Sequence, residues 1–434
     1  MKKTFAIIIA LVLVLSMVAC TAEQAAQVQQ AAEQVANDPA VQQAVTDAAA
    51  AVESAVGEAT APAAADFKVG VILVHDENSG YDLAHIDGVK AAQATLGLTD
   101  DQIIYKYNIP EDETCYDTAV DLAEQGCSII FSDSYSHQSY MMQAAAEYPD
   151  VFFVACTGDT AAAQPVKNVA NMFPYTFQSR YVSGVVAGMK LKELMDAGTV
   201  KDAYVGYVGA YPYAEVVSGY TAFFLGIRSI VPEAHMDVQY TNSWYDPTAE
   251  AEAANALISK GCVIIGQHAD STGAPSAVQA AMDAGKVVYS VGYNVSMLAV
   301  APKAALTSAQ NNWGALYTPV IDMRMKGETI PTDTAKGYAD DGVMISELGE
   351  SCAAGTAEKV AEVVAGLKDG SIDVFDCKNF TVGGEAVTTY LALDTDGDWV
   401  GDTGEAIVDG IFEESVLRSA PYFGLRIDGI TELN

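Results

Sequence analysis

Aromatic and uncharged or acidic polar residues gather in the short segments that follow the apolar runs of this sequence. A flat heterocycle is bound by stacking on aromatic faces and by Asp or Asn at its edge, and a sugar uses an aromatic platform in a similar way. Arg and Lys, which would hold a phosphate or carboxylate, are almost absent from these segments. The pattern therefore predicts a site for a heterocycle or a sugar, drawn from Asn78, Tyr81, Asp133, Tyr135, Tyr211, Tyr213, Asn242, Trp244, Tyr245, His268, Asp270, Tyr293, Asn294, Asn312 and Trp313.

Some of these residues also have a purely structural interpretation. Trp244 and Tyr245 precede Asp246 and Pro247 and could simply anchor a turn. His268 could be a hydrogen-bonded core histidine, which is the commoner role for a buried imidazole. We favour ligand contacts for Trp244 and Tyr81, because each follows the end of an apolar run.

The motifs of common enzyme classes are missing from the sequence. There is no Gly-x-Ser-x-Gly, no Gly-x-Gly-x-x-Gly after an apolar run, no Gly-Lys-Thr phosphate loop and no His-Glu-x-x-His. The five histidines show no metal-ligand spacing, and no Cys-x-x-Cys pair occurs. The acidic stretch 394–402 resembles half of a calcium loop, but a tight acidic turn is the favoured interpretation. We expect a non-enzyme without metal or cofactor.

Two apolar motifs recur at nearly constant spacing along the chain. Gly-Cys-Ser-Ile-Ile at 126–130 returns as Gly-Cys-Val-Ile-Ile at 261–265, and the run at 68–72 has a counterpart at 204–208. Such an offset indicates one unit used twice. Apolar strands alternate with Ala-rich helical stretches, which is typical of a parallel sheet covered on both faces. The sequence thus predicts an α/β fold with two Rossmann-like lobes, and ligands would bind beyond the carboxyl ends of the strands.

The expected elements follow that alternation. A long helix at 177–197 carries the small residues Ser183, Gly184, Ala187 and Gly188, which predict close packing where the chain passes between lobes. A strand at 305–309 and a helix at 316–326 are expected to return to the first lobe. Other strands are expected at 69–74, 103–107, 128–132, 151–155, 203–208, 236–241, 263–267 and 287–291, and other helices at 83–96, 115–125, 141–148, 215–227, 249–260, 274–284 and 356–367.

The N-terminus has the pattern of a bacterial lipoprotein signal. Lys2 and Lys3 precede an apolar run, and Met-Val-Ala-Cys ends at Cys20, the expected lipidated residue. Residues 20–66 are rich in Ala and Gln and predict an anchor and linker after a signal peptide at 1–19. The first lobe is expected at 67–177 with a return segment at 293–330, and the second at 178–292 with 331–434. We expect the protein on the outer face of the cell membrane.

The formal net charge of −35 argues against nucleic acid and anionic membrane surfaces as partners, so the lipid anchor is the expected membrane contact. Six cysteines remain if Cys20 carries lipid, and Cys352 and Cys377 could form a disulfide outside the cell.

Several short segments resemble the basic membrane protein family of lipoproteins. They are Ser79-Gly80-Tyr81 with Ala84-His85 and Gly88, Tyr148-Pro149-Asp150-Val151, Tyr181 with Gly184 and Ala187-Gly188, Asn242-Ser243-Trp244-Tyr245-Asp246-Pro247, and Gln267-His268-Ala269-Asp270-Ser271. The resemblance runs from about Phe67 to the Pro421-Tyr422-Phe423 tail. It implies a type I periplasmic-binding-protein fold with a hinge, and delivery of purine nucleosides or related bases to the permease of an ABC importer.

The resemblance also implies residue roles. Tyr81 matches a stacking aromatic, and Ser134 or Tyr135 falls near a base-edge contact. Asn294 stands where nucleoside-binding members carry a ribose-gripping Asp, and Asn311 or Asn312 where they carry a Lys, so we expect a purine base more than a nucleoside. A sugar or autoinducer receptor, a sensory receptor lobe and a surface hydrolase stay as alternatives. The expected ligand-binding residues are Asn78, Ser79, Tyr81, Ser134, Tyr135, Tyr211, Trp244, His268, Asp270, Tyr293, Asn294, Asn312 and Trp313.

Overall fold

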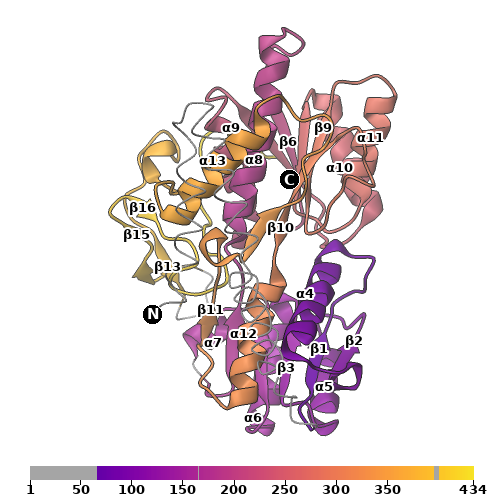
Figure 1. Ribbon diagram of the computed structural model, residues 1–434. Helices are drawn as coiled ribbons and strands as arrows, with labels where there is room; N and C mark the ends of the chain where they lie inside the picture. Colours follow the sequence, from indigo (N-terminus) through magenta and orange to yellow (C-terminus); the bar gives the residue numbers. More distant parts are fainter. Residues whose placement is uncertain (1–65, 165, 395–399) are drawn as a thin grey trace, which may run out of the picture. The chain divides into compact units, whose positions relative to one another are not determined.

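The computed structural model describes residues 66–164, 166–394 and 400–434 (Figure 1). The expected signal peptide, Cys20, nearly all of the linker and most of the acidic turn at 394–398 lie outside these residues. The first lobe contains a six-stranded sheet in the order β11-β5-β4-β3-β1-β2, and its strands are parallel. These strands are β1 (Val69–Ile72), β2 (Ile103–Lys106), β3 (Ile129–Ser132), β4 (Phe152–Ala155), β5 (Val169–Met172) and β11 (Asp333–Thr334).

The second lobe contains a seven-stranded sheet in the order β12-β10-β9-β8-β6-β7-β17. In both sheets the first strand of the lobe lies between the second and the third, so β2-β1-β3 corresponds to β7-β6-β8. The repeat predicted from the two motifs is therefore present in the topology. The strands are β6 (Tyr204–Gly209), β7 (His235–Tyr240), β8 (Ile264–Gln267), β9 (Tyr289–Tyr293), β10 (Ala305–Asn311), β12 (Val343–Ile345) and β17 (Ile430–Glu432).

Helices alternate with these strands, as their apolar patterning and caps dictate. Ser79 caps α4 by accepting from the Asp82 amide, and Asp246 caps α10, which has Pro247 in its first turn and Gly261 after its end. The helices are α4 (Gly80–Leu96), α5 (Glu113–Glu124), α6 (Gln138–Glu147), α7 (Thr160–Ala163), α8 (Thr176–Asp196), α9 (Ala214–Arg228), α10 (Pro247–Lys260), α11 (Gly273–Asp283), α12 (Trp313–Lys326) and α13 (Thr356–Asp369).

Helices α8 and α9 pack closely, as the small residues of α8 predicted. A Cβ added at Gly184 would lie 2.0 Å from the carbonyl oxygen of Phe223, and one at Gly226 would lie 2.2 Å from that of Tyr181. Each glycine thus permits a backbone approach that any side chain would block. The two helices belong to the buried core of the second lobe, with Val182, Phe223 and others.

Three segments of the described chain pass between the lobes, at 172–176, 311–313 and 334–343. They are bonded to one another: the Thr176 hydroxyl donates to Asn311 Oδ1 over 2.9 Å, and the Asn312 amide group donates to the Asp341 carbonyl over 2.8 Å. Because all three run side by side, they form the hinge between the lobes.

Two expectations about the return to the first lobe need correction. The strand expected at 305–309 is β10, which pairs with β9 in the sheet of the second lobe, so only α12 and β11 return. Residues 333–334, expected in the second lobe, form β11 beside β5 in the first. Periodicity shows that a segment is a strand, but it carries no information about which sheet the strand joins.

The region after α13 adds short strands and an aromatic cluster to the second lobe. Phe375, Phe412 and Phe423 pack together, with the rings of Phe375 and Phe423 stacked 4.2 Å apart. β17 then extends the sheet beside β7. The remaining strands are β13 (Leu391–Leu393), β14 (Thr403–Glu405), β15 (Ile407–Val408) and β16 (Ile411–Phe412).

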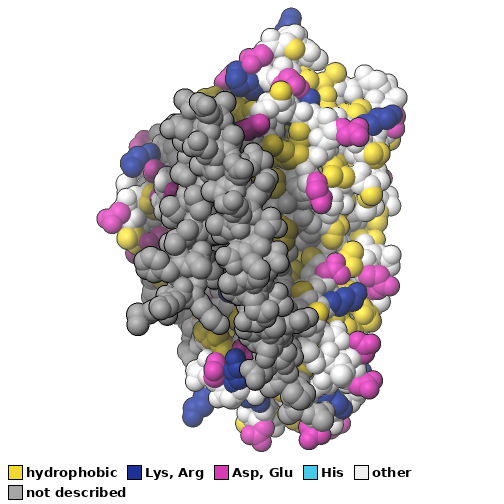
Figure 2. Space-filling model, in the orientation of Figure 1, with side chains coloured by type: hydrophobic (Ala, Val, Ile, Leu, Met, Phe, Trp, Pro, Cys, Tyr) yellow, Lys and Arg dark blue, Asp and Glu magenta, His cyan; other side chains and the backbone are white. Residues whose placement is uncertain are grey.

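The surface and the cysteines complete the description. On the face that Figure 2 shows, acidic and basic side chains are scattered rather than gathered into one basic region. The cysteines of the described residues are all free thiols, so Cys352 and Cys377 are not bonded to each other. Within the described part of the chain, no helix combines the length and apolar character needed to cross a membrane.

Candidate functional site

A pocket lies where the loops at the carboxyl ends of the two sheets meet. It encloses about 390 Å³ of space outside the atoms, part of which opens to solvent. Both lobes contribute to its wall, which matches the rule for ligand sites in α/β sheets. The lining residues are Val74, Tyr81, Asp133, Ser134, Tyr135 and Thr157 from the first lobe, with Glu215, Trp244, His268, Asp270 and Tyr293 from the second.

Two tyrosines of the first lobe are fixed by their hydroxyl groups. Tyr81, in the first turn of α4, donates to the carbonyl of Cys156 over 3.0 Å, and Tyr135 donates to Asp159 Oδ2 over 2.5 Å. Burial is the main cause that raises the pKa of both phenols above the ordinary value, so both stay protonated. The two rings are thereby held at the pocket wall with their positions set before any ligand arrives.

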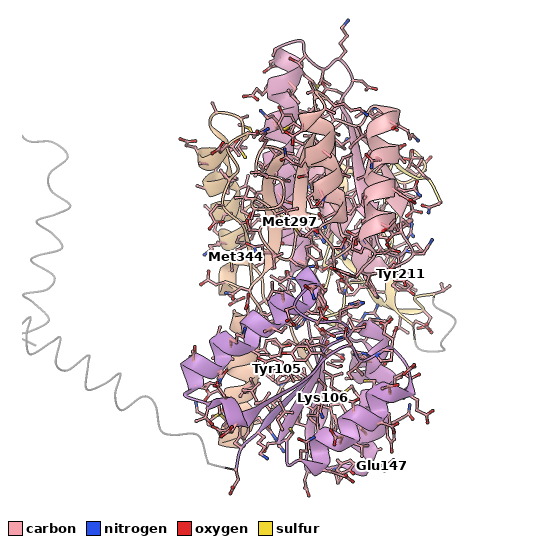
Figure 3. All side chains as sticks on the ribbon, turned by 90° about the vertical axis from the view of Figure 1, so that its right-hand side faces the viewer. Tyr105, Lys106, Glu147, Tyr211, Met297 and Met344 are labelled. Carbon is pink, nitrogen blue, oxygen red and sulfur yellow. The ribbon has the colours of Figure 1, made fainter. Side chains whose placement is uncertain are left out.

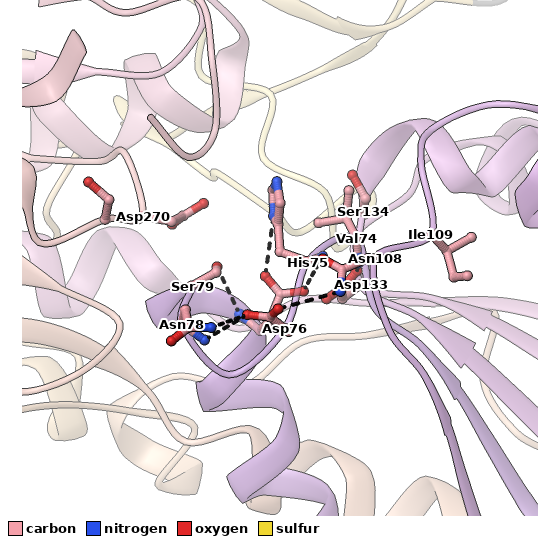
Figure 4. A network of polar contacts seen from close by, with 12 residues as sticks. Val74, His75, Asp76, Asn78, Ser79, Asn108, Ile109, Asp133, Ser134 and Asp270 are labelled. Atoms are coloured by element: carbon pink, nitrogen blue, oxygen red, sulfur yellow. Dashed lines mark hydrogen bonds and ion pairs between the residues drawn. The ribbon is translucent and has the colours of Figure 1, made fainter. Parts of the chain in front are cut away.

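Asp133, which follows β3, is a carboxylic acid at the pocket rather than a carboxylate. Its Oδ1 accepts from the Val74 amide over 3.0 Å (Figure 4). Its neighbour Asp82 is also buried. Burial, followed by the adjacent negative charge of Asp82, raises the pKa of Asp133 well above its usual range. The pair therefore holds one proton, which the two carboxyl groups share, and Asp133 presents a largely uncharged carboxyl group to the pocket.

The second lobe contributes an aromatic group around Trp244. This residue follows β7, and its carbonyl accepts from the Asp270 amide over 2.8 Å. Its ring lies edge-on to Tyr211 with centroids 5.1 Å apart, and Tyr211 stacks on Tyr213. Asp246, two residues on, fixes the loop by capping α10. A half-buried indole held this way is a stacking surface for a flat ring.

A buried polar group lies behind this aromatic wall. His268 Nε2 is 3.4 Å from Glu215 Oε1, and the guanidinium of Arg180 lies 3.4 Å from the centroid of Tyr293. Arg180 is buried and donates to the carbonyl of Gln267 over 2.6 Å. Burial, then the Arg180 charge, lowers the pKa of His268 well below its usual value, so the imidazole is neutral. Burial raises the pKa of Glu215 to about 7.

Several buried polar atoms of the pocket wall have no hydrogen-bond partner. They include the Thr157 hydroxyl, Nδ1 of His268 and the Tyr293 hydroxyl. Buried polar groups in native proteins are almost always paired, and leaving one unpaired costs about 1–3 kcal/mol. A ligand with donors and acceptors on its rim would satisfy these groups.

The two lobes touch across the pocket. The Gly80 amide at the start of α4 donates to the carbonyl of Asp270 over 3.0 Å, and the rings of His75 and Tyr245 lie 5.6 Å apart. Figure 4 shows Asp270 facing the loop that carries Asn78 and Ser79. A Cβ at Gly80 would lie 3.2 Å from the Asp270 oxygen, so the glycine permits this approach. The structure thus represents a closed arrangement of the lobes.

Seven of the thirteen expected ligand-binding residues line this pocket. They are Tyr81, Ser134, Tyr135, Trp244, His268, Asp270 and Tyr293.

Three of the others support the wall from outside it. Asn78 donates to the Asp76 carboxylate within its own loop, and Ser79 caps α4. Tyr211 packs beside Trp244. Figure 3 shows Tyr211 at the end of the second lobe that faces the first.

The last three expected residues have structural partners. Asn294 donates its amide group to Asp270 Oδ1 over 2.7 Å. Asn312 is bonded within the hinge, and Trp313 is buried and stacked on His85 with centroids 3.8 Å apart. Asn312 and Trp313 therefore lie away from the pocket wall. Asn312 is held in the hinge, and Trp313 is packed between α4 and α12.

Sequence reasoning missed Val74, Glu215 and Arg180, and it left Asp133 and Thr157 out of the final set although both lie in loops that follow strands. The internal repeat could have found Glu215, since the start of α9 corresponds to the start of α4, where Tyr81 lies. Arg180 had no signal of its own, because it lies within a helix and not after a strand.

The buried acids predict how stability depends on pH. Burial raises the pKa of Glu250 to about 7, from 4.5, and that of Glu215 likewise. A raised pKa means that the folded state binds the proton more tightly than the unfolded state does. The contribution of these two glutamates to the free energy of unfolding is therefore fully present below pH 4.5 and is lost as pH rises through 7. We expect the Tm of the unliganded protein to fall between pH 5 and pH 8, and Glu250→Gln to flatten that slope. Scanning calorimetry tests this, with the exposed Glu328→Gln as control; an equal slope in both variants would contradict it.

Comparison with known proteins identifies the family. Residues 68–365 match the Bmp family model, described as ABC transporter substrate-binding protein PnrA-like. The chain belongs to this family. Its members are substrate-binding components of ABC transporters, which work outside the cytoplasm.

Two curated relatives and one solved structure are informative about this Bmp-family chain. A putative ABC transporter glucose-binding protein of Haloferax volcanii is 32% identical over 58% of this chain and 60% of its own length. A purine-binding protein of Brucella abortus is 32% identical over 62% of this chain and 73% of its own. An ABC transporter solute-binding protein of Aeropyrum pernix, 16% identical, matches 70% of this chain and 92% of its own with a TM-score of 0.60, which shows the shared two-lobed fold.

Proposed function

We propose that this protein captures a purine base between its lobes and delivers it to the permease of an ABC importer. The observation that carries the proposal is the pocket wall, which combines aromatic rings with buried carboxyl groups whose pKa values are raised by burial. Trp244 and Tyr81 offer ring faces, and Asp133 and Asp270 offer buried carboxyl groups whose raised pKa favours the uncharged form. A purine presents two aromatic faces and alternating donors and acceptors at its edge.

The charges at the wall support an uncharged ligand over an anionic one. Its lining residues include three carboxyl groups, Asp133, Glu215 and Asp270, and no Lys or Arg among the described residues. A phosphate or carboxylate in this position would meet negative or protonated carboxyl groups without a cation in contact. A nucleotide is therefore a poor fit.

A base is favoured over its nucleoside by what Asn294 and Asn312 do in the structure. By family resemblance, Asn294 stands where nucleoside-binding members carry an Asp for ribose, and Asn311 or Asn312 stands where they carry a Lys. Asn311 is buried and accepts from the Thr176 hydroxyl within the hinge. The Asn294 amide group is committed to Asp270, and that of Asn312 to the hinge. Ribose would gain little from either side chain.

A sugar is the second candidate, because the Haloferax relative is named as a putative glucose-binding protein. Aromatic platforms with Asp groups also suit a pyranose ring. The two ligand classes differ in how they use the site: a purine needs rings on its faces, whereas a sugar needs hydrogen-bond partners around most of its rim.

A ligand panel measured by thermal shift and then by calorimetry separates these candidates. Adenine, guanine, hypoxanthine, their nucleosides, D-glucose and an amino acid would be compared at equal concentration. We expect a free base at 100 times its Kd to stabilise the protein by about 2.7 kcal/mol, and the matching nucleoside to do so less. A response to glucose alone would replace the purine assignment with the sugar one, and tighter binding of nucleosides than of bases would overturn the base preference.

We also propose that Cys20 carries the lipid that holds the protein at the outer face of the membrane. The support is the Met-Val-Ala-Cys sequence after an apolar run. Membrane fractionation of cells producing the wild type and Cys20→Ala tests this, and an equally membrane-bound Cys20→Ala protein would contradict it.

A further inference from the structure

Residues 413–423, between β16 and β17, connect the two lobes outside the hinge. We call this segment the strap. It lies beyond residue 365, where the match to the family model ends. At its start Glu414 accepts from the Ser218 hydroxyl on α9, and at its end Phe423 packs on Phe375, both in the second lobe. In its middle Ser419 donates through its amide and its hydroxyl to Asp333 Oδ1, each over 2.7 Å, in the first lobe.

Arg418 brings the strap to the ligand pocket through one intermediate residue. Its guanidinium Nη1 lies 3.0 Å from Asp159 Oδ2, the same oxygen that accepts from the Tyr135 hydroxyl over 2.5 Å. The side chains of Arg418 and Asp159 are only 16% and 21% exposed. An ion pair at such depth is screened less than one at the surface. Tyr135, at the far end of this chain of contacts, lines the pocket.

The placement of these contacts gives the strap a mechanical consequence. Asp333 lies in β11, next to the hinge, whereas Asp159 lies in the loop after β4, on the pocket side of the first lobe. When the lobes separate, the distance between Asp159 and the second lobe grows more than the distance near the hinge. The Arg418–Asp159 pair is therefore broken by opening and restored by closing, while Ser419 keeps the strap attached.

We propose that the strap holds the lobes in the closed arrangement and that Arg418 is a positioning residue, which fixes the Tyr135 hydroxyl through Asp159. Arg418 does not touch the ligand. Without Arg418, Asp159 still accepts the hydrogen bond of the Tyr135 hydroxyl. The positive charge that holds the Asp159 carboxylate in place is then missing. The effect on ligand affinity rests on the proposed function, whereas the effect on lobe closure does not.

The closure arm of the test needs no ligand. Arg418→Met is compared with Arg426→Met, which removes an equal charge from an ion pair with Glu432 within the second lobe. Acrylamide quenching of Trp244 fluorescence is measured in a Trp399→Phe background, in which Trp313 is shielded by burial. We expect Arg418→Met to increase quenching and Arg426→Met to leave it unchanged. Equal quenching in both variants would overturn the proposal that the strap holds the lobes closed.

The affinity arm uses adenine and calorimetry. We expect Arg418→Met to weaken binding about tenfold, the scale of one charged hydrogen bond, and Arg418→Lys to recover part of the loss. If Arg418 acts through Tyr135, the double variant with Tyr135→Phe binds no worse than the weaker single variant. If the loss of affinity in the double variant equals the product of the two single losses, Arg418 does not act through Tyr135 and the positioning role is overturned. Failure of the wild type to bind adenine would count against the proposed function alone, because the quenching result still decides closure.

Discussion

Replacement of Trp244 by alanine is expected to weaken binding of a purine base by about 1–3 kcal/mol, or roughly 5- to 150-fold. The indole lies at the pocket wall beside His268 and Tyr211, and its loop is held by the Asp270 amide. Truncation to a methyl group removes the stacking surface and leaves the backbone bond to Asp270 in place. Isothermal calorimetry with adenine measures the loss directly.

A matched control separates stacking from a general loss of aromatic surface. Tyr107 is 41% exposed, stacks on Tyr105 and does not line the pocket. Figure 3 labels Tyr105, which lies in β2 of the first lobe. Tyr107→Ala should bind as the wild type does. Unchanged affinity in Trp244→Ala, with an unchanged melting curve, would remove Trp244 from the site and would favour a ligand held mainly by hydrogen bonds, such as a sugar.

Gly184→Ala is expected to cost about 3 kcal/mol or more of stability, which corresponds to a Tm about 4 °C lower for a folding unit of this size. The added Cβ would lie 2.0 Å from the Phe223 carbonyl oxygen, and a backbone atom cannot move aside as a flexible side chain can. Helices α8 and α9 would have to separate, which disturbs the core of the second lobe. Thermal unfolding followed by circular dichroism measures the change.

Gly188→Ala, one turn along the same helix, is the appropriate control. There the new Cβ would lie 3.0 Å from the Ile227 oxygen, a tight contact that a shift of a few tenths of an ångström relieves. Both changes gain the same helix propensity, because alanine replaces glycine in each. Equal melting temperatures in the two variants would show that the helices can move apart without loss, contrary to the close packing described above.

Much of the fold could be read from the sequence, because parallel sheets covered on both faces leave a strong pattern. The runs at 129–132 and 264–267 are fully buried strands, and their repetition predicted two equivalent sheets. The partners of isolated strands were harder to predict. β11 pairs with β5, which lies far away in the sequence, and such pairing depends on hinge geometry that no local pattern encodes. β10 pairs with its sequence neighbour β9, but its apolar pattern alone did not show that it stays in the second lobe.

The site was predictable to the extent that it lies in loops after strands. Tyr81, Trp244 and His268 are found where that rule placed them. Arg180 and Glu215 reach the same region from helices, so a rule based on loops passes over them. The protonation of Asp133 was also invisible, because it depends on burial beside Asp82, which lies 51 residues earlier in the sequence.

The hinge also determines the order in which the molecule can be assembled. β5 pairs with β11 through residues that include Asn171 and Asp333, which are 162 positions apart in the chain. During synthesis, the first lobe lacks α12 and β11 until residues 313–334 have been made, and by then β6 to β10 of the second lobe already exist. Pairings over such long separations slow folding, because the loop between them must be closed first. The two lobes are therefore expected to fold as one interdependent unit, and cutting the chain at the first crossing would not release two independent domains.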